Sequence, residues 1–285
     1  MPMIQSRGTD REEALVQTFI KRDRFGRSSL AGEAAALQWL AAAEADGGIH
    51  VASVVSATDA ELVEERIVTR AATAAAARMA GSALAKTHAA GAPWWGCPPV
   101  GWSGSYRIEH SLTPTVDKSD APSTWGSFYA EYRVMAYVRV LRDSRQYASS
   151  EVAVYDRLAS RLISGIYDAP QPTLVTAHGY EVARLHGDLW AGNLLWDANQ
   201  ANPTGAALID PMAYGGHAET DLAMLDLFGC SYLDELLRGY NETSTLADGW
   251  RERIGLHQLA PLLLHCVLFG GFYLNVALRT ARRYI

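Results

Sequence analysis

One short string of the sequence, HGDLWAGN at residues 186–193, holds residue types suited to phosphoryl transfer. It contains the pattern H-x-D, formed by His186 and Asp188, and four residues separate Asp188 from Asn193. In phosphoryl transfer the Asp of such a loop orients the attacking hydroxyl and accepts its proton, while the Asn helps to hold a metal ion. Gly192 permits a tight bend that turns both side chains toward one pocket. The string predicts Asp188 as a catalytic base and Asn193 as a metal ligand.

A second candidate metal ligand, Asp210, ends the short apolar run AALI at residues 206–209. A carboxylate at the end of an apolar strand is unfavourable unless it is paired. A hard cation such as Mg²⁺, bridging two phosphates, is a natural partner. By itself Asp210 could equally be a turn residue before Pro211. With Asp188 and Asn193 ahead of it in the chain, the set predicts a Mg²⁺ site.

Two charged residues near the N-terminus complete the pattern. A kinase needs a cation against the phosphates of its nucleotide and a helix carboxylate that holds this cation in place. Lys21 lies in the strand-like segment at residues 14–22, and Glu33 lies early in the helix expected next. A lone Lys–Glu pair is usually a solvated surface feature. The order Lys, Glu, H-x-D-x4-N and Asp is nevertheless the one that a two-lobed, ATP-dependent kinase requires.

The elements that must position these residues divide the chain in two. Alternating β-branched and aromatic residues predict strands in the first 68 residues, and an Ala- and Leu-rich stretch predicts one helix among them. From residue 69 onward the pattern is mainly helical, with a run of short strands and loops at residues 183–214. We therefore expect an α+β fold with a small N-lobe, 1–68, and a larger C-lobe, 69–285. The expected ranges are strands at 14–22, 49–57 and 61–68, helices at 31–45, 71–90, 125–141 and 150–164, an ordered loop at 93–123, and helices from about 219.

Composition limits the class of protein. The 285 residues carry a net charge of -6, which argues against non-specific binding to nucleic acid. Three widely spaced cysteines and no C-x-x-C pair predict neither a disulfide framework nor a zinc site. The N-terminal residues hold no apolar core of signal-peptide length, and the apolar stretch at 259–278 is interrupted by polar and glycine residues. We expect a soluble cytoplasmic monomer that does not enter membranes, with 259–278 forming a buried helix pair or a kinked helix.

Three strings in the second half of the chain carry a resemblance to a known family. HGDLWAGN at 186–193, DPMAYGG at 210–216 and HAETDLAMLDLF at 217–228 resemble the fructosamine (ketosamine-3-) kinase family, a branch of the aminoglycoside-phosphotransferase-like group. Weaker likeness covers nearly the whole chain. It includes FIKR around Lys21, LVEERI at 62–67, LAKTH at 84–88, WGSFYAEYR at 125–133 and HCVLFGGFY at 265–273.

The resemblance implies a protein-kinase-like fold and transfer of the ATP γ-phosphate to the sugar 3-hydroxyl of a ketoamine, either free or protein-bound. Phosphorylation makes such sugar–amine adducts fall apart, which is a deglycation repair activity. By the same resemblance, Asp188 is the base, Asn193 and Asp210 are Mg²⁺ ligands, and Lys21 is the phosphate clamp supported by Glu33.

The resemblance also implies further site residues. Glu64 and Glu65 are expected at the hinge strand near the adenine, and Trp190 is expected to stack on the sugar, although a core tryptophan would read the same way. His186, His217 and Glu219 are expected at the substrate. His217, Glu219 and Asp221 also suit the start of a helix, where they would brace the catalytic loop. Asp221 and Arg133 are interpreted as supporting residues.

One departure from the family pattern concerns the segment before Lys21. Kinases of this shape place a glycine-containing hairpin over the phosphates, and here only 20 residues precede Lys21, with Gly8 as their one glycine. We expect either a shortened hairpin or the absence of part of the family's N-terminal region. Two alternatives therefore remain: an aminoglycoside or other amino-sugar phosphotransferase, and a non-catalytic nucleotide-binding module. The segment 93–123 holds three tryptophans and few acidic residues, which favours a ketoamine over a polyamine-like acceptor.

Overall fold

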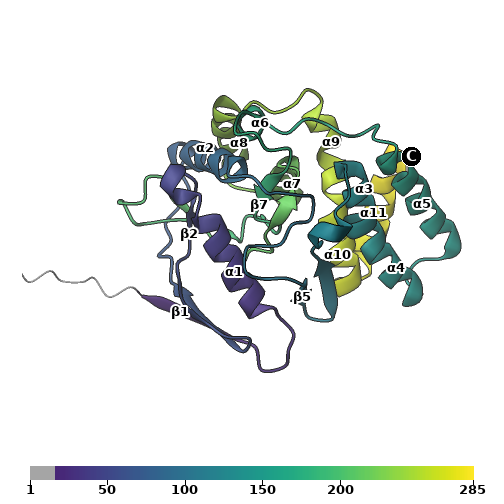
Figure 1. Cartoon of the computed structure of the whole chain (residues 1–285), viewed down its shortest axis with the longest axis horizontal. Helices are drawn as coiled ribbons and strands as arrows, with labels where there is room; N and C mark the ends of the chain where they lie inside the picture. Colours follow the sequence, from purple (N-terminus) through teal and green to yellow (C-terminus); the bar gives the residue numbers. More distant parts are fainter. Residues whose placement is uncertain (1–16) are drawn as a thin grey trace, which may run out of the picture.

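The computed structural model describes residues 17–285 and begins with a three-stranded antiparallel sheet (Figure 1). The sheet has the order β1-β4-β3, formed by Thr18–Arg22, Glu61–Glu65 and Val54–Ala57. In the β1–β4 register Lys21 lies opposite Leu62, and Phe19 lies opposite Glu64. The predicted strand at 14–22 is confirmed over its described part, and its first residues lie outside the described range.

Helix α1, Leu30–Ala41, packs on this sheet through an apolar stripe. Leu30, Leu37 and Leu40 are buried at helical spacing, and they share a core with Leu62 of β4. The helix ends four residues before the predicted boundary. A short 3₁₀ turn, Glu44–Asp46, follows it and is closed by Gly47 in the left-handed conformation. This packing fixes Glu33, on the first turns of α1, beside the strand that carries Lys21.

The rest of the described chain is mainly helical (Figure 1). The predicted helix at 125–141 is present and extends to Asp143, but a π-helical segment at Ala130–Met135 separates its two α-helical parts. The apolar stretch at 259–278 forms the predicted helix pair, which turns at Gly270 and Gly271. None of the described helices is both long and apolar enough to cross a membrane. The helices are α2 Ala74–Ala89, α3 Trp125–Tyr129, α4 Ala136–Asp143, α5 Ser149–Ile163, α6 Thr173–Ala177, α7 Glu219–Leu227, α8 Leu233–Thr243, α9 Trp250–His257, α10 Leu259–Phe269 and α11 Phe272–Ala281.

Two short strand pairs in this region frame the candidate site. Strand β7, Ala183–Leu185, pairs with β10, Tyr214–Gly216, and β8, Leu194–Trp196, pairs with β9, Ala206–Leu208. Strand β2, His50–Val51, runs parallel to β9, so the two halves of the chain share a sheet. The predicted division at 68 and 69 falls in the connection between β4 and α2.

The sequence predicts an ordered loop at 93–123, but this segment contains a hairpin. Strands β5, Ser105–Ile108, and β6, Ser111–Pro114, are joined by a two-residue turn. The first turn residue, Glu109, has a φ of 53°, a conformation for which two-residue hairpins usually use Gly, Asn or Asp. The usual turn signal is therefore missing from the sequence. On these strands Tyr106 and Thr113 are buried, so the hairpin packs firmly on the rest of the fold.

Candidate functional site

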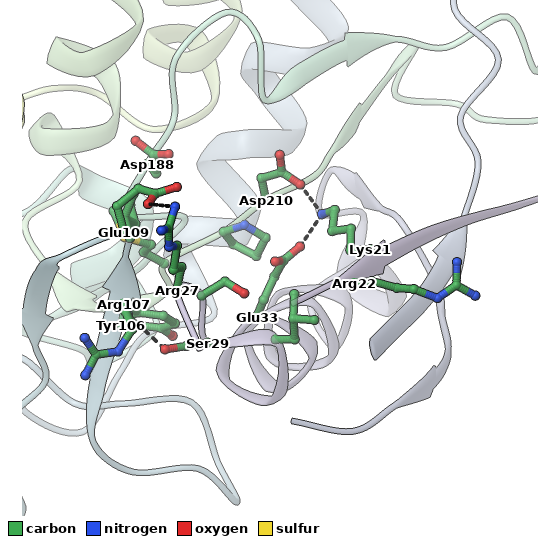
Figure 2. Close-up of a pocket in the computed structure, with 15 residues that line it drawn as sticks. Lys21, Arg22, Arg27, Ser29, Glu33, Tyr106, Arg107, Glu109, Asp188 and Asp210 are labelled. Atoms are coloured by element: carbon green, nitrogen blue, oxygen red, sulfur yellow. Dashed lines mark hydrogen bonds and ion pairs between the residues drawn. The ribbon is translucent and has the colours of Figure 1, made fainter. Parts of the chain in front are cut away.

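A cavity of about 390 Å³ lies where the N-terminal sheet, the β5–β6 hairpin and the loops after β7 and β9 meet. Figure 2 shows the side chains that line it. Lys21 and Glu33 come from the N-lobe elements, and Asp188 and Asp210 come from the two C-lobe loops. The cavity thus collects four of the residues that the sequence singled out, from elements far apart along the chain.

The loop that carries Asp188 packs closely against neighbouring segments of the chain. Gly187 has a φ of 84°, and a Cβ there would lie 2.1 Å from the carbonyl oxygen of Met212. Only glycine fits such a close approach. The ring of His186 is buried, with Nε2 2.9 Å from the carbonyl oxygen of Ile209, while Nδ1 accepts the backbone N–H of Asp188 at 3.2 Å. Burial lowers the pKa of His186, in keeping with a neutral ring. His186 therefore shapes the loop from behind, and this placement argues against the predicted substrate contact.

Asp221, near the start of α7, braces the same loop. Its carboxylate accepts the backbone N–H groups of His186 at 2.7 Å and Gly187 at 3.0 Å. Its third partner is His88, whose Nε2 lies 3.2 Å away and whose Nδ1 contacts the hydroxyl of Tyr240 at 2.8 Å. Burial alone would raise the pKa of Asp221, but the hydrogen bond and charge of His88 hold it below the ordinary value. These contacts suit the supporting role predicted for Asp221.

Asp188 and Asn193 are in direct contact. The Asn193 Nδ2 group donates to the backbone oxygen of Asp188 at 2.8 Å and to its Oδ2 at 3.2 Å. Burial raises the pKa of Asp188 to about 7; the hydrogen bond from Asn193 opposes this rise, and the charge of Asp210 adds to it. The amide nitrogen faces Asp188, so within residues 17–285 the Asn193 Oδ1 atom remains available as a metal ligand.

Asp210 lies near Asn193 because the start of β8 and the end of β9 are paired side by side. Leu194 pairs with Leu208, and the backbone N–H of Ile209 donates to the Asn193 carbonyl oxygen at 3.1 Å. Asp210 itself has a φ of 56°, an unfavourable conformation for a residue with a side chain. Such strained residues cluster at functional sites. The three residues that the sequence predicted as one site do converge.

Lys21 lies among three carboxylates, and we call Lys21, Glu33, Glu64 and Asp210 the lysine cluster. Its Nζ contacts one carboxylate oxygen each of Glu33 and Asp210 and lies 3.0 Å from Glu64 Oε1. Burial alone would lower the pKa of Lys21, but the charges of Glu33 and Asp210 raise it. Burial raises the pKa of Glu33 to about 7, although the charge of Lys21 opposes the rise. The cluster has more negative groups than its single cation can balance.

The two acids predicted near the adenine separate onto opposite faces of β4. Glu64 is only 2% exposed and turns toward Lys21, and its Oε2 has no hydrogen-bond partner within the described residues. Glu65 faces the other way, where it accepts the N–H and hydroxyl of Ser53 and lies 3.3 Å from His50 Nε2. The structure therefore joins Glu64 to the lysine cluster and leaves Glu65 away from the cavity.

The donor set fits a hard divalent cation. The Asn193 Oδ1 atom and the Asp210 carboxylate supply oxygen ligands, the type that Mg²⁺ prefers. Carboxylate oxygens of Glu33, Glu64 and Asp210 also lie within 4.8 Å of one another, but the Lys21 ammonium already sits among them. The lysine cluster thus already holds a cation, and the metal-ligand role of Asn193 and Asp210 stays a prediction.

Trp190, two residues after Asp188, is half exposed at 42%. Its ring lies over Gly192, where a Cβ would meet the ring at 2.3 Å, and meets the ring of Phe228 edge to face at 6.5 Å. Trp190 is thus not a core residue. Its exposed aromatic surface lies two residues along the chain from Asp188, and its stacking role stays a prediction.

His217 and Glu219 are buried outside this cavity. With Arg253 and His257 they form what we call the histidine cluster. Arg253 donates two hydrogen bonds to Glu219, at 2.6 and 2.9 Å, and His257 Nε2 lies 3.2 Å from it. Burial alone would raise the pKa of Glu219, but the hydrogen bonds from His257 and Arg253 hold it well below its usual range. The predicted substrate contacts of His217 and Glu219 do not fit this placement, since all these groups are already paired inside the fold.

Arg133 supports the fold from the π-helical segment. Its Nη1 donates to the carbonyl oxygens of Pro114 and Tyr132, and its guanidinium lies 3.9 Å from the ring centre of Tyr214. This buried arginine ties the β5–β6 hairpin to the helical region. The position agrees with the supporting role expected of it.

The sequence did not point to the residues that the hairpin contributes. Tyr106 and Glu109 line the cavity, and so does Arg27 from the loop before α1. Arg27 and Glu109 form an ion pair at 3.3 Å across the two segments (Figure 2). The hairpin strands SYRI and SLTP lie in a segment rich in Gly, Pro and Trp, and the second strand buries Ser111 and Thr113 and exposes Leu112, so apolar alternation did not reveal it.

Known proteins resemble this chain in both sequence and fold. A "probable ketoamine kinase" of Enterococcus faecium is 29% identical over 192 residues, which are 67% of this chain and 61% of that protein. The chain thus spans less than two thirds of the length of the first curated relatives it matches. The crystal structure of a "putative fructosamine-3-kinase" from Thermobifida fusca YX-ER1 superimposes with a TM-score of 0.78 at 37% identity, covering 94% of this chain and 85% of that one.

More distant structures share the architecture alone. The gentamicin complex of the phosphotransferase APH(2")-IIa aligns with a TM-score of 0.57 at 11% identity, over 94% of this chain and 85% of that one. These neighbours confirm the predicted α+β, two-lobed, protein-kinase-like fold. The sequence model described as fructosamine kinase matches residues 9–285. This chain belongs to the fructosamine kinase family.

Proposed function

We propose that this protein is an ATP- and Mg²⁺-dependent kinase that phosphorylates a sugar hydroxyl, the 3-hydroxyl by family resemblance, of a ketoamine. The observation that carries the proposal is that Asp188, which Asn193 contacts, lines one cavity with Asp210 and Lys21. A family member that had lost catalysis would have no need to keep a buried base, an amide oxygen and a strained carboxylate together. Phosphorylation that makes the ketoamine fall apart and releases the amine would make the activity a deglycation step.

Asp188 performs the proton chemistry in this proposal. The acceptor hydroxyl donates its hydrogen bond to the Asp188 carboxylate, which fixes the hydroxyl oxygen toward the γ-phosphorus. As the new P–O bond forms, the bond from the γ-phosphorus to the bridging oxygen breaks, the hydroxyl proton passes to Asp188, and ADP leaves. Asn193 orients Asp188 through its amide nitrogen. Asp221 keeps the loop in place through two backbone N–H groups.

The remaining groups bind the charged end of the nucleotide. Asn193 Oδ1 and Asp210 would hold Mg²⁺, which neutralises phosphate charge when bound. Lys21 would contact the α- and β-phosphates, with Glu33 and Glu64 fixing its position. Residues 1–16, ahead of Lys21, lie outside the described part of the chain. On the acceptor side, the exposed face of Trp190 offers a surface on which the sugar stacks.

The test is ATP consumption with a panel of acceptors, with the phosphorylated product identified by mass spectrometry. We expect activity with ribulose-lysine or fructose-lysine and little with kanamycin. The variant Asp188→Asn should lose at least about 10³-fold in kcat and still bind nucleotide. Equal rates for wild type and variant would remove Asp188 from its role. Activity with kanamycin alone would assign the protein to the amino-sugar alternative.

A further inference from the structure

Arg27 is a cavity-lining cation that no part of the proposed mechanism uses. Its one ionic partner within residues 17–285 is Glu109, through a single contact of 3.3 Å between side chains that are each more than half exposed. Arg253, by contrast, holds Glu219 through two shorter hydrogen bonds inside the fold. Exposed single-contact pairs contribute little stability, so Arg27 can exchange Glu109 for another anion at small cost.

The backbone around Arg27 is fixed even though its side chain is loosely held. The Asp23 carboxylate accepts the N–H of Ser28 at 2.7 Å and its hydroxyl at 2.9 Å. The carbonyl oxygen of Arg27 accepts the N–H of Glu109 at 2.8 Å, and Ser28 pairs with Ile108 as an isolated β-bridge. The loop before α1 and the β5–β6 hairpin are thereby joined across the mouth of the cavity. Arg27 is a positioned cation with an exchangeable partner.

A nucleotide triphosphate bound in the cavity would need a further cation besides Lys21. The ammonium of Lys21 is already shared among Glu33, Glu64 and Asp210. Asp188 adds a further carboxyl group to the same cavity. A bound nucleotide triphosphate brings more negative charge than Lys21 can offset. Figure 2 shows the Arg27 guanidinium on the same side of the view as Asp188, whereas Arg22 points away and pairs with Glu61.

We propose that Arg27 binds the terminal phosphate of the nucleotide, releasing Glu109 when it does so. This inference rests on the proposed function, because it assumes a nucleotide triphosphate in the cavity. The planar guanidinium matches phosphate oxygens with paired N–H donors, which a lysine cannot do. The Glu109 carboxylate, on the hairpin, pairs with Arg27 until a γ-phosphate binds. Arg27 thus lets the site distinguish a triphosphate from a diphosphate, which favours product release.

The experiment compares nucleotide affinities by titration calorimetry, with Mg²⁺ present and no acceptor. The ligands are AMPPNP, which carries a γ-phosphate, and ADP, which does not. We expect Arg27→Gln to weaken AMPPNP binding by about 10-fold or more and to change ADP binding by less than about 2-fold. Glu109→Gln should tighten AMPPNP binding, because it removes the competing carboxylate. Arg24→Gln, on the same exposed loop but outside the cavity, is the matched control and should change neither affinity.

The outcomes separate this inference from the proposed function. If the wild type binds neither nucleotide, the proposed function is overturned and the inference with it. If the wild type binds both nucleotides, and Arg27→Gln alters both affinities equally or neither, the role of Arg27 is overturned and the kinase proposal stands. If steady-state assays show that Arg27→Gln changes the KM of the acceptor while both nucleotide affinities are unchanged, the role of Arg27 is likewise overturned and Arg27 is placed at the substrate.

Discussion

The lysine cluster and the histidine cluster are both groups of buried or half-buried charges, yet they differ in how completely they are balanced. In the histidine cluster one carboxylate, Glu219, meets Arg253 and His257, and every group has a partner inside the fold. In the lysine cluster one ammonium faces three carboxylates, and an oxygen of Glu64 has no hydrogen-bond partner in the described chain.

The direction of the pKa shifts follows this difference. Good pairing holds the pKa of Glu219 down, while burial raises the pKa of Glu33 to about 7 and also raises that of Glu64. A balanced cluster stabilises the fold and needs nothing further. An unbalanced cluster with perturbed pKa values at the edge of a cavity is a candidate functional site. Each cluster has four residues, but the lysine cluster has three carboxylates to one cation and the histidine cluster has one carboxylate. The balance of charge therefore distinguishes a supporting cluster from a candidate functional one.

The largest expected effect is on catalysis through the lysine cluster. Asp210→Asn removes one of the three carboxylates around Lys21 and one proposed Mg²⁺ ligand. We expect kcat to fall by at least about 10³-fold, because the metal site is lost. The free energy of unfolding should be unchanged or higher by about 1 kcal/mol, because like charges are relieved. Steady-state kinetics and urea unfolding check both numbers. A variant that unfolds more easily and keeps its activity would reverse the assignment of the two clusters.

The histidine cluster should respond in the opposite way. Glu219→Gln breaks a buried bidentate pair and leaves Arg253 without its counter-charge, so we expect the free energy of unfolding to fall by about 3 kcal/mol. The kcat of the folded variant should stay within about 3-fold of wild type. Glu131→Gln is the control: it removes an exposed bidentate pair with Arg139, and the expected loss is below about 1 kcal/mol. Similar losses in the two variants would show that burial of the cluster contributes nothing.

The smallest effect is a difference in pH dependence between the clusters. Burial lowers the pKa of His217 to about 4, so between that value and about 6.5 the unfolded chain binds the proton more readily. The stability of wild type relative to His217→Gln should therefore fall as the pH is lowered through this range. Glu33 has a raised pKa of about 7, so the folded state binds the proton first. The stability of wild type relative to Glu33→Gln should rise as the pH falls from about 7 to 4.5.

Urea unfolding of the three proteins at pH 7.5, 6 and 5 measures these two trends, and we expect changes of roughly 1 kcal/mol or more in each. The same sign in both comparisons would contradict the proposed contrast.

The sequence and the structure agree where the arrangement is local. The sequence grouped Asp188, Asn193 and Asp210, and the pairing of β8 with β9 brings the segments of Asn193 and Asp210 side by side. The apolar stripe of α1 sets Glu33 beside Lys21. Sequence reasoning failed where long-range packing decides the outcome. Whether His217 faces a substrate or Arg253 depends on α9, more than thirty residues later in the chain.

The β5–β6 hairpin escaped prediction for a different reason. Its turn uses Glu109 in a conformation for which two-residue turns usually use Gly, Asn or Asp, so the sequence lacks the usual turn signal. As a result Arg27 and Glu109, which meet only through this hairpin, could not be recognised as part of the cavity. The alternating faces of β4, which turn Glu64 to Lys21 and Glu65 away from it, also depend on register and not on residue type.

The most direct measurement is a crystal structure with ADP and Mn²⁺ in place of Mg²⁺, in which anomalous scattering locates the metal. We expect a metal peak within about 2.5 Å of both Asn193 Oδ1 and an Asp210 carboxylate oxygen, with Asp188 facing the same cavity. A metal bound elsewhere in the protein, with the side chains of 193 and 210 left free, would contradict it.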